Sequence, residues 1–113
     1  MNQRVDLHMH TLYSDGIKTP EELIEFARSR GVSVMCINDH DNVKGVMNML
    51  ELEKKEDITV LCGIELSSSF TDGSTIHTTG YFPRDTDFAS MQAELEKSVP
   101  EKRYVIYTLV NHK

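Results

Sequence analysis

The sequence predicts an α/β domain in which parallel strands alternate with helices. Apolar, strand-like segments begin near Val5, Val32 and Ile58, at intervals of roughly 30 residues, the usual length of a strand-helix-strand unit. Between them lie segments whose apolar residues recur at helical spacing. Ligands of such sheets collect at the carboxyl ends of the strands, so we expect the functional side chains at that edge.

The first strand (residues 5–9) is expected to be followed by a helix that begins after Thr19 and ends at Gly31. Thr19 is a good N-cap, Pro20 suits the first helical position, and Glu22 completes a capping box with Thr19. A glycine directly after the last turn is a common helix end. The side chains expected to form the apolar stripe of this helix are Leu23, Phe26 and Ala27.

The remaining segments continue the alternation. We expect a strand at 32–38 that is buried on both faces, a helix at 43–55, a strand at 58–64, an antiparallel excursion at 66–70 and 74–82 around a turn at 71–73, and a helix at 88–97 that ends before Pro100. In the last helix, Phe88, Met91 and Leu95 are expected to face inward. Residues 104–110 are strand-like in composition, but a helix fits them as well.

Composition is typical of one soluble domain, which we place at residues 1–113, with 39% hydrophobic and 27% charged side chains. The formal net charge of −6 argues against broad electrostatic capture of nucleic acid, which needs a basic surface. The apolar runs are too short to cross a bilayer and no signal-peptide core precedes the first strand, so we expect a cytoplasmic protein. Cys36 and Cys62 are predicted to be reduced, buried packing thiols.

A metal-binding pattern stands at the first strand. Asp6, His8 and His10 alternate with apolar residues, and the period of a strand places them on one face. Two imidazoles at this spacing can converge on one ion, and Asp15 adds a carboxylate from the following loop, where Gly16 lets the backbone turn. The alternative is an edge strand whose histidines are simply solvated.

Further candidate ligands follow the next strands. Asp39, His40 and Asp41 come after the second strand, Glu65 after the third, and His77 lies on the next strand pair. Each has an alternative: the Asp39 segment could cap the second helix, and Glu65 could lie on the surface. Their coincidence at three successive strand ends favours one metal site.

Several linked motifs together resemble the polymerase and histidinol phosphatase (PHP) superfamily. In order, the motifs are Asp6-Leu7-His8-Met9-His10-Thr11, Ser14-Asp15-Gly16, Thr19-Pro20-Glu21-Glu22-Leu23, Ile37-Asn38-Asp39-His40-Asp41, Gly63-Ile64-Glu65-Leu66-Ser67, and Ile76-His77 with Gly80-Tyr81-Phe82. They span roughly residues 5 to 82. The resemblance implies a distorted β7α7, TIM-like barrel that hydrolyses phosphoesters with two or three divalent metal ions.

The resemblance also implies roles for individual residues. His8 and His10 would bind one ion, Glu65 would bridge two, His77 would join the second, and Asp15 with His40 would hold the third; Asp39 and Asp41 would orient the ligands. Asp15, His40 and Glu65 would then act in catalysis through the metals, with no side-chain nucleophile. Imidazole and carboxylate ligands suit Zn²⁺, Mn²⁺ or Fe²⁺.

Members of this superfamily usually run to about twice the present length, and their second half supplies further ligands. We therefore expect either a fragment of a longer barrel, incomplete at its C-terminus, or a short protein that self-associates as a homo-oligomer to cover its open sheet. Two functions remain open. The first is a metal-dependent phosphoesterase acting on a small phosphorylated metabolite or nucleotide, and the second is a non-catalytic metal-binding or assembly module.

Overall fold

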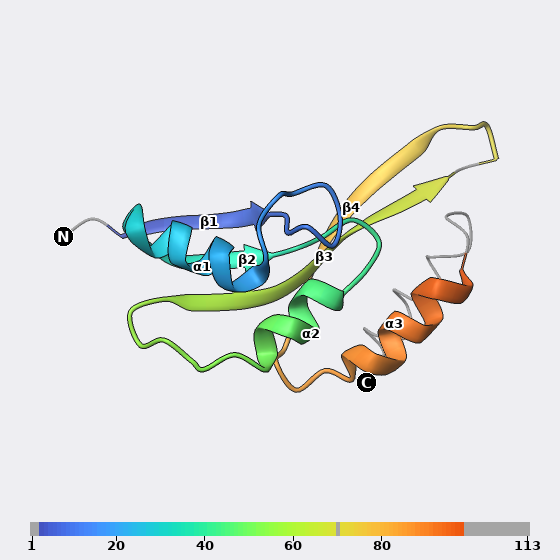
Figure 1. The fold of residues 1–113 in the computed structure, drawn as a ribbon. Coiled ribbons are helices and arrows are strands. Elements are labelled where there is room, and N and C mark those ends of the chain that lie inside the picture. Colours follow the sequence, from blue (N-terminus) through green and yellow to red (C-terminus); the bar gives the residue numbers. More distant parts are fainter. Residues whose placement is uncertain (1–2, 70, 99–113) are drawn as a thin grey trace.

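The computed structural model describes residues 3–69 and 71–98 (Figure 1). The four strands are β1 (Arg4–Met9), β2 (Val32–Ile37), β3 (Thr59–Ser69) and β4 (Thr75–Phe82), and the three helices are α1 (Pro20–Ser29), α2 (Lys44–Leu50) and α3 (Phe88–Lys97). Pro100 and the segment 104–110 lie outside the described residues. None of the helices in the described part is long and apolar enough to cross a membrane.

The strands form one mixed sheet in the order β1-β2-β3-β4. β1 pairs with β2, and β2 with β3, in parallel, whereas β3 and β4 are antiparallel. α1 and α2, which connect the parallel strands, lie over the same face of the sheet (Figure 1). The expected alternation of parallel strands and helices and the expected antiparallel excursion are both confirmed, in a curled four-stranded sheet that resembles half of a barrel.

The curl of the sheet is visible in one hydrogen bond between its outermost strands. The hydroxyl of Tyr81, on β4, donates to the carbonyl oxygen of Leu7, on β1, at 2.9 Å. Three strand spacings in a flat sheet amount to about 14 Å, which is further than a tyrosine side chain reaches. The two outer strands must therefore bend toward each other, and the tyrosine side chain spans the concave face between them.

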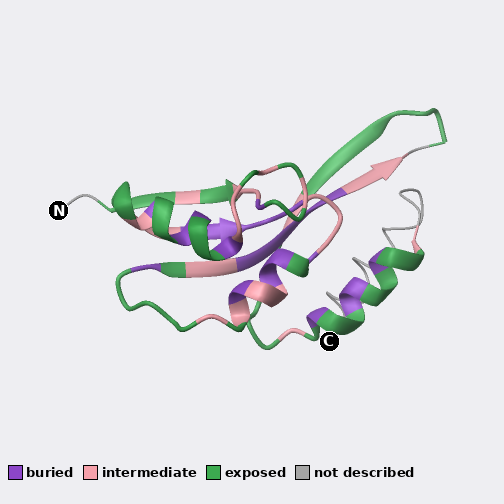
Figure 2. Cartoon of the chain, in the orientation of Figure 1, coloured by how far each residue is buried: buried purple, intermediate pink, exposed green. Residues whose placement is uncertain are grey.

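The convex face of the sheet forms the hydrophobic core. Ile37 lies opposite Cys62 on β3, and Cys62 lies opposite Phe82 on β4, so side chains from three strands meet under the helices. Buried residues run along β2 and the middle of β3, whereas β1 and much of β4 are exposed (Figure 2). Cys36 and Cys62 are free and buried, as predicted, and burial raises the pKa of the Cys36 thiol to about 12.

The start and end of the first helix match the features predicted from the sequence. The hydroxyl of Thr19 accepts a hydrogen bond from the Glu22 amide at 3.1 Å, and the Glu22 carboxylate accepts one from the Thr19 amide at 2.9 Å, which completes the predicted capping box. Gly31 has a φ of +77°, which suits a glycine after a helix end. Phe26 was expected in the core, but its ring is exposed and lies beneath the cations of Lys18 and Arg30.

Two segments differ from the expectation. The second helix was expected to reach residue 55, but α2 ends at Leu50, because the charged segment that follows offers only Leu52 to the core. The third strand was expected to end near Glu65, but β3 continues to Ser69. It can continue because β4 takes over as its partner from Cys62 onward, after the pairing with β2 has ended.

The last helix packs beside α2. Phe88, Met91 and Leu95 of α3 are buried, as predicted. Gln92 is also buried, and its side-chain oxygen accepts a hydrogen bond from the Val43 amide at 2.8 Å. Val43 is the N-cap of α2 and provides no side-chain cap, so α3 satisfies a backbone group at the start of the shorter helix.

We expect Thr19→Ala to lower the free energy of unfolding by about 1 kcal/mol, because the first turn of α1 loses its cap. Urea denaturation followed by circular dichroism measures this change. Thr19→Ser is the matched control, since it keeps the hydroxyl and should unfold near the midpoint of the unchanged chain. Equal midpoints for the alanine and serine variants would show that the cap contributes nothing.

Candidate metal centre

Six polar side chains meet at the carboxyl end of the parallel strands. They come from the end of β1, the loop that follows it, the segment after β2, the middle of β3, and β4; the residues are His8, His10, Asp15, His40, Glu65 and His77. The structure thus brings together the six residues in which the sequence predicted ligands. Asp6 does not belong to these groups; its carboxylate accepts a hydrogen bond from the His8 amide at 3.1 Å.

The Glu65 carboxylate lies at the centre of the cluster. Its Oε1 is 2.7 Å from Nε2 of His8 and 3.4 Å from Nε2 of His10. Its Oε2 is 3.5 Å from Nδ1 of His40 and 3.3 Å from Nδ1 of His77. The Glu65 side chain is only 12% exposed, so four imidazoles replace most of the water around this charge.

The backbone of Glu65 is held on both sides of the residue. Its amide donates to the carbonyl oxygen of Asp39 at 2.9 Å, and its carbonyl accepts from the Asp41 amide at 3.0 Å, which makes a short parallel bridge opposite His40. Asp41 has a φ of +57°, a conformation that aspartate tolerates better than most residues. Its carboxylate accepts a hydrogen bond from the Ser67 amide at 2.7 Å.

The Asp39 side chain fixes the loop that carries Asp15. Asp39 is 1% exposed and accepts hydrogen bonds from the amide and hydroxyl of Thr11, both at 2.6 Å, and from the hydroxyl of Ser14 at 2.8 Å. Gly45 of α2 passes so close that a Cβ there would contact a carboxylate oxygen of Asp39. This aspartate therefore acts on the loop around Asp15.

Two hydrogen-bonding residues beside the cluster were not predicted from sequence. Thr11 binds Asp39, and Asn38 joins the strand ends, since its amide group accepts from the Met9 amide at 2.8 Å and donates to the Leu7 carbonyl at 3.0 Å. Both side chains are fully buried. A buried asparagine at the end of an apolar strand is the one available signal, because buried amides need partners.

The charges of the cluster favour a bound cation. Both ring nitrogens of His40 face carboxylates, with Nε2 at 3.2 Å from Asp15 and Nδ1 at 3.5 Å from Glu65. A neutral imidazole carries one proton, so its other nitrogen would direct a lone pair at a carboxylate oxygen. The His10 and His40 rings are stacked with centroids 4.5 Å apart, so imidazole nitrogens and carboxylate oxygens crowd one place, and a cation there would interact favourably with both kinds of donor.

A further observation concerns Nδ1 of His10. This atom is buried and forms no hydrogen bond within the described residues, which is unusual for a buried polar atom. A cation at this position would accept the lone pair.

The ligand atoms also form three groups in which all atoms lie within 4.8 Å of one another: His8, His10 and Glu65; His10, Asp15 and His40; and His40, Glu65 and His77. The donors therefore fit divalent metal ions.

Known proteins are similar to this chain in sequence and in fold. The chain is 32% identical over 106 residues to a 5'-3' exoribonuclease of Haemophilus influenzae, a match that covers 93% of this chain and 38% of that protein. It is 34% identical over 76 residues to a 3',5'-nucleoside bisphosphate phosphatase of Chromobacterium violaceum, a match that covers 67% of this chain and 26% of that protein.

Among solved structures, the fold resembles an amidohydrolase of Chromobacterium violaceum with a TM-score of 0.68 and 29% identity, over 83% of this chain and 32% of that one. It also resembles an inferred metal-dependent phosphoesterase of Bifidobacterium adolescentis with a TM-score of 0.63 and 25% identity, over 97% of this chain and 44% of that one. The chain thus spans less than half of each of these relatives. The model of the PHP domain matches residues 6–108, and the chain belongs to the PHP domain family.

Proposed function

We propose that this chain contributes the metal centre of a hydrolase that cleaves phosphate esters of a small metabolite or a nucleotide. The observation that carries the proposal is the Glu65 carboxylate among four imidazoles, two of which, His10 and His40, also face Asp15. The names of the two relatives, an exoribonuclease and a bisphosphate phosphatase, support phosphoester chemistry.

Two or three divalent ions, Zn²⁺, Mn²⁺ or Fe²⁺, suit the imidazole and carboxylate donors. In the proposed assignment, His8, His10 and Glu65 hold one ion, Glu65 and His77 hold the second together with His40, and Asp15 and His40 hold the third together with His10. When bound, such ions supply an activated water and stabilise negative charge on a phosphoryl group.

The residues of the chain itself would bind the ions and orient one another. Glu65 joins two ligand groups through its two oxygens, and the backbone pairing on both sides of Glu65 keeps it between the histidines. His8 and His77 are half exposed, so this rim of the cluster is open to a substrate phosphoryl group. The Ser14 hydroxyl donates a hydrogen bond to the buried Asp39 carboxylate, which suits a structural serine better than a nucleophile.

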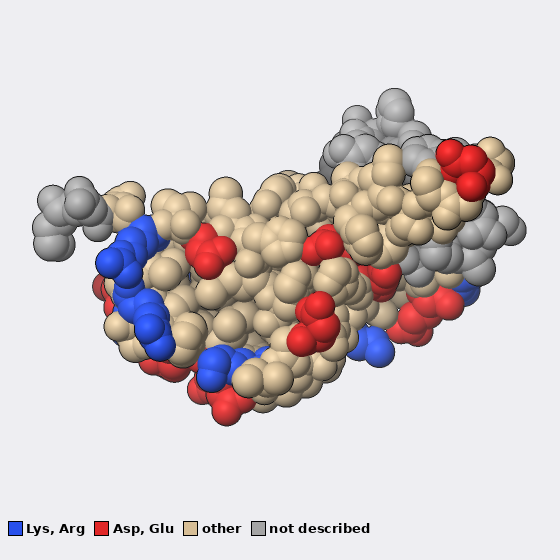
Figure 3. Space-filling model, turned by 90° about the horizontal axis from the view of Figure 1, so that it is seen from above, with Lys and Arg blue, Asp and Glu red and all other residues tan. Residues whose placement is uncertain are grey.

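We also propose that the four strands are part of a seven-stranded, TIM-like β/α barrel. Among the described residues, β1 pairs with β2 alone, and its apolar Val5 and Leu7 are 56% and 40% exposed. An open parallel edge with apolar side chains favours a cover of further strands, from a longer chain or from a second copy of this one. On the face in Figure 3, lysines and arginines lie at the left end and along the lower edge, with acidic side chains among them and a largely neutral surface between. This face carries no broad basic patch of the kind that nucleic acid needs, which fits a small substrate.

A metal-binding or assembly module without turnover is the second candidate. It is favoured by one observation, the share of the relatives that the chain spans, which is 38% of the exoribonuclease and 26% of the phosphatase. Residues that complete the site or choose the substrate in those proteins can lie in their remaining length.

We expect the purified chain to bind two or more divalent ions, measured by elemental analysis, and to hydrolyse p-nitrophenyl phosphate when Mn²⁺ is added. His10→Ala and Glu65→Gln should lower both metal content and turnover, the latter by about 100-fold or more, because the ions stabilise the transition state by several kcal/mol. Glu94→Gln, on the exposed side of α3, is the control and should change neither quantity.

The two candidate functions give different results in this experiment. Bound metal without turnover, on this substrate and on bis(p-nitrophenyl) phosphate, would favour the module. Turnover that is unchanged in Glu65→Gln would contradict the proposed centre, and so would a folded chain that binds no ion.

We expect Asp39→Asn to weaken metal binding by about 10-fold to 100-fold, as is typical when a residue that orients ligands is changed. The asparagine can accept fewer of the three hydrogen bonds that fix the loop around Asp15. Competition with a chromophoric chelator measures the affinity. Asp87→Asn, which changes a cap on α3 far from the cluster, is the control, and equal affinities in the two variants would contradict the role of Asp39.

A further inference from the structure

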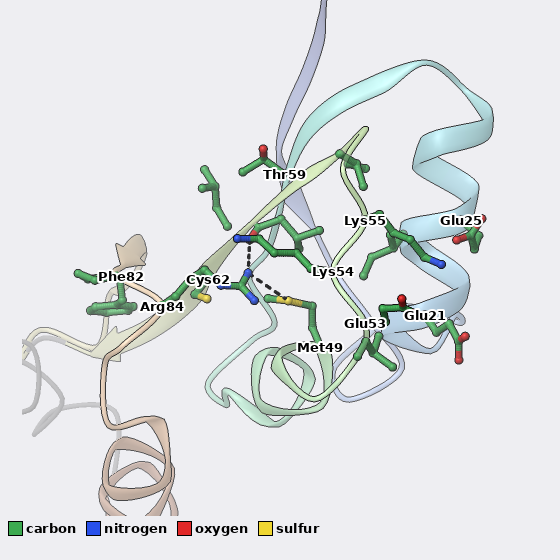
Figure 4. A pocket seen from close by; sticks show the side chains of 16 residues that line it. Glu21, Glu25, Met49, Glu53, Lys54, Lys55, Thr59, Cys62, Phe82 and Arg84 are labelled. Carbon is green, nitrogen blue, oxygen red and sulfur yellow. Dashed lines mark hydrogen bonds between the residues drawn. The ribbon is translucent and has the colours of Figure 1, made fainter.

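A second site lies on the convex side of the sheet, away from the histidine cluster. It is a pocket of about 340 Å³ between α1, α2 and the first half of β3 (Figure 4). The pocket exists because α2 ends at Leu50, so the chain leaves the sheet where a longer helix would have covered it. Its volume falls in the range of small-molecule sites.

The pocket is apolar along its walls. Side chains from α1, α2, the loop after α2, β3 and β4 provide this surface; they include Ile24, Met49, Leu52, Ile58, Val60 and Phe82. Ile58 and Met49 belong to the hydrophobic core, and Leu52, Val60 and Phe82 pack partly buried against it. The surface is thus a continuation of the core that remains open to solvent, and it suits an apolar ligand body.

Arg84 brings a positive charge to one end of this surface. The last β3–β4 pair is Cys62 with Phe82, so the Val60 carbonyl has no partner on β4, and Nη1 of Arg84 donates to it at 3.3 Å. Nη1 also lies 3.8 Å from the sulfur of Met49. The hydrogen bonds of Arg84 to the described residues use Nη1 alone, which leaves the N–H groups of Nη2 and Nε for a ligand.

The positive charge of Arg84 has an electrostatic effect on the Cys62 thiol in the pocket. Burial raises the pKa of the Cys62 thiol, and the nearby guanidinium of Arg84 opposes this rise. Lys54 adds a second cation, because its side chain extends toward Arg84 in Figure 4. Within residues 3–69 and 71–98, the ion pairs of lysines and arginines are those of Arg28 with Glu25 and Asp57, so neither Lys54 nor Arg84 is neutralised.

The opposite end of the pocket is acidic. Glu21, Glu25 and Glu53 line it, and Lys55 points toward the first two from the loop after α2 (Figure 4). Within the described residues Glu25 is paired with Arg28, so the carboxylates of Glu21 and Glu53 remain at this end. Arg84 lies beside Cys62 at the other end, with Lys54 extending toward it. A ligand with one anionic head is attracted to the end with Arg84 and Lys54, which favours one orientation in the pocket.

We propose that this pocket binds an amphipathic organic anion. The carboxylate or phosphate head lies against the planar guanidinium of Arg84 and the ammonium of Lys54, a pairing that guanidinium groups make through two parallel hydrogen bonds. The apolar body lies over Ile24 and Ile58. The site is distinct from the metal cluster, since Cys62 and Glu65 are three residues apart on β3, about 10 Å along the strand, and face opposite sides of the sheet.

Titration of the ¹⁵N-labelled chain with octanoate tests the proposal. We expect saturable shifts of the amide signals of Met49, Val60 and Cys62, because these residues line the cationic end. Octylammonium, which has the same apolar body and the opposite charge, should bind at least tenfold more weakly. The titration is done with a chelator present, so that no shift arises from octanoate bound to a metal ion.

The variants separate charge recognition from general hydrophobic binding. Arg84→Gln should weaken octanoate binding by about tenfold or more, as expected when a hydrogen bond between charged groups is lost, and Lys54→Gln by a smaller factor. Lys97→Gln removes the same charge from α3, outside the pocket, and should bind like the unchanged chain. Since Lys54 is exposed, its variant keeps the test valid even where Arg84→Gln perturbs the fold.

Three results would overturn the proposal. They are equal affinities for octanoate and octylammonium, equal losses in Arg84→Gln and Lys97→Gln, and amide shifts that centre on residues outside the pocket or are absent at millimolar octanoate. None of these results bears on the proposed hydrolase, because the histidine cluster is measured separately by its metal content.

Discussion

The candidate centre depends on the pairing of one short backbone segment with Glu65. The amide and carbonyl of Glu65 bind the carbonyl of Asp39 and the amide of Asp41, so the chain after β2 follows β3 beyond the end of their regular pairing. This pairing requires the positive φ of Asp41. It sets His40 opposite Glu65 and leaves the Asp39 side chain to hold the loop of Asp15. The three segments are therefore placed together by backbone geometry, which gathers the carboxylates and imidazoles at one point.

The curl of the sheet gives its two faces different chemistry. The hydrogen bond from Tyr81 to Leu7 draws the outer strands toward each other across the concave face, where histidine and glutamate side chains converge. The convex face is covered by helices and carries the core. Because neighbouring residues of a strand point to opposite faces, β3 serves both: Cys62 and Ile64 pack under the helices, while Glu65 faces the histidines.

Local signals in the sequence were sufficient for some features and not for others. The limits of α1 could be predicted because Thr19, Pro20, Glu22 and Gly31 act within one turn of the helix ends. The gathering of the six candidate ligands could be predicted because polar residues interrupt apolar segments at the carboxyl edge expected for a parallel sheet. The end of α2 at Leu50 was missed although the charged segment after it offers only Leu52 to the core. The expected strands at 58–64 and 66–70 form one strand, β3, because β4 pairs with it continuously from Cys62 to Ser69. Phe26 was misplaced for a related reason, since two cations stabilise its exposed ring.

The short helix α2 and the buried glutamine of α3 are structurally linked. A helix of seven residues is too short to be stable alone, and Gln92 of α3 binds the Val43 amide at its start. Gly45, although unfavourable in a helix, lets Asp39 approach the same first turn. Contacts with Asp39 and Gln92 thus stabilise the first turn of α2, and the helix ends at Leu50. The beginning of α2 contacts the loop that carries Asp15, through Gly45 and Asp39, and the end of α2 borders the opening on the convex face. The pocket and the candidate centre thus share one short helix and keep separate surfaces.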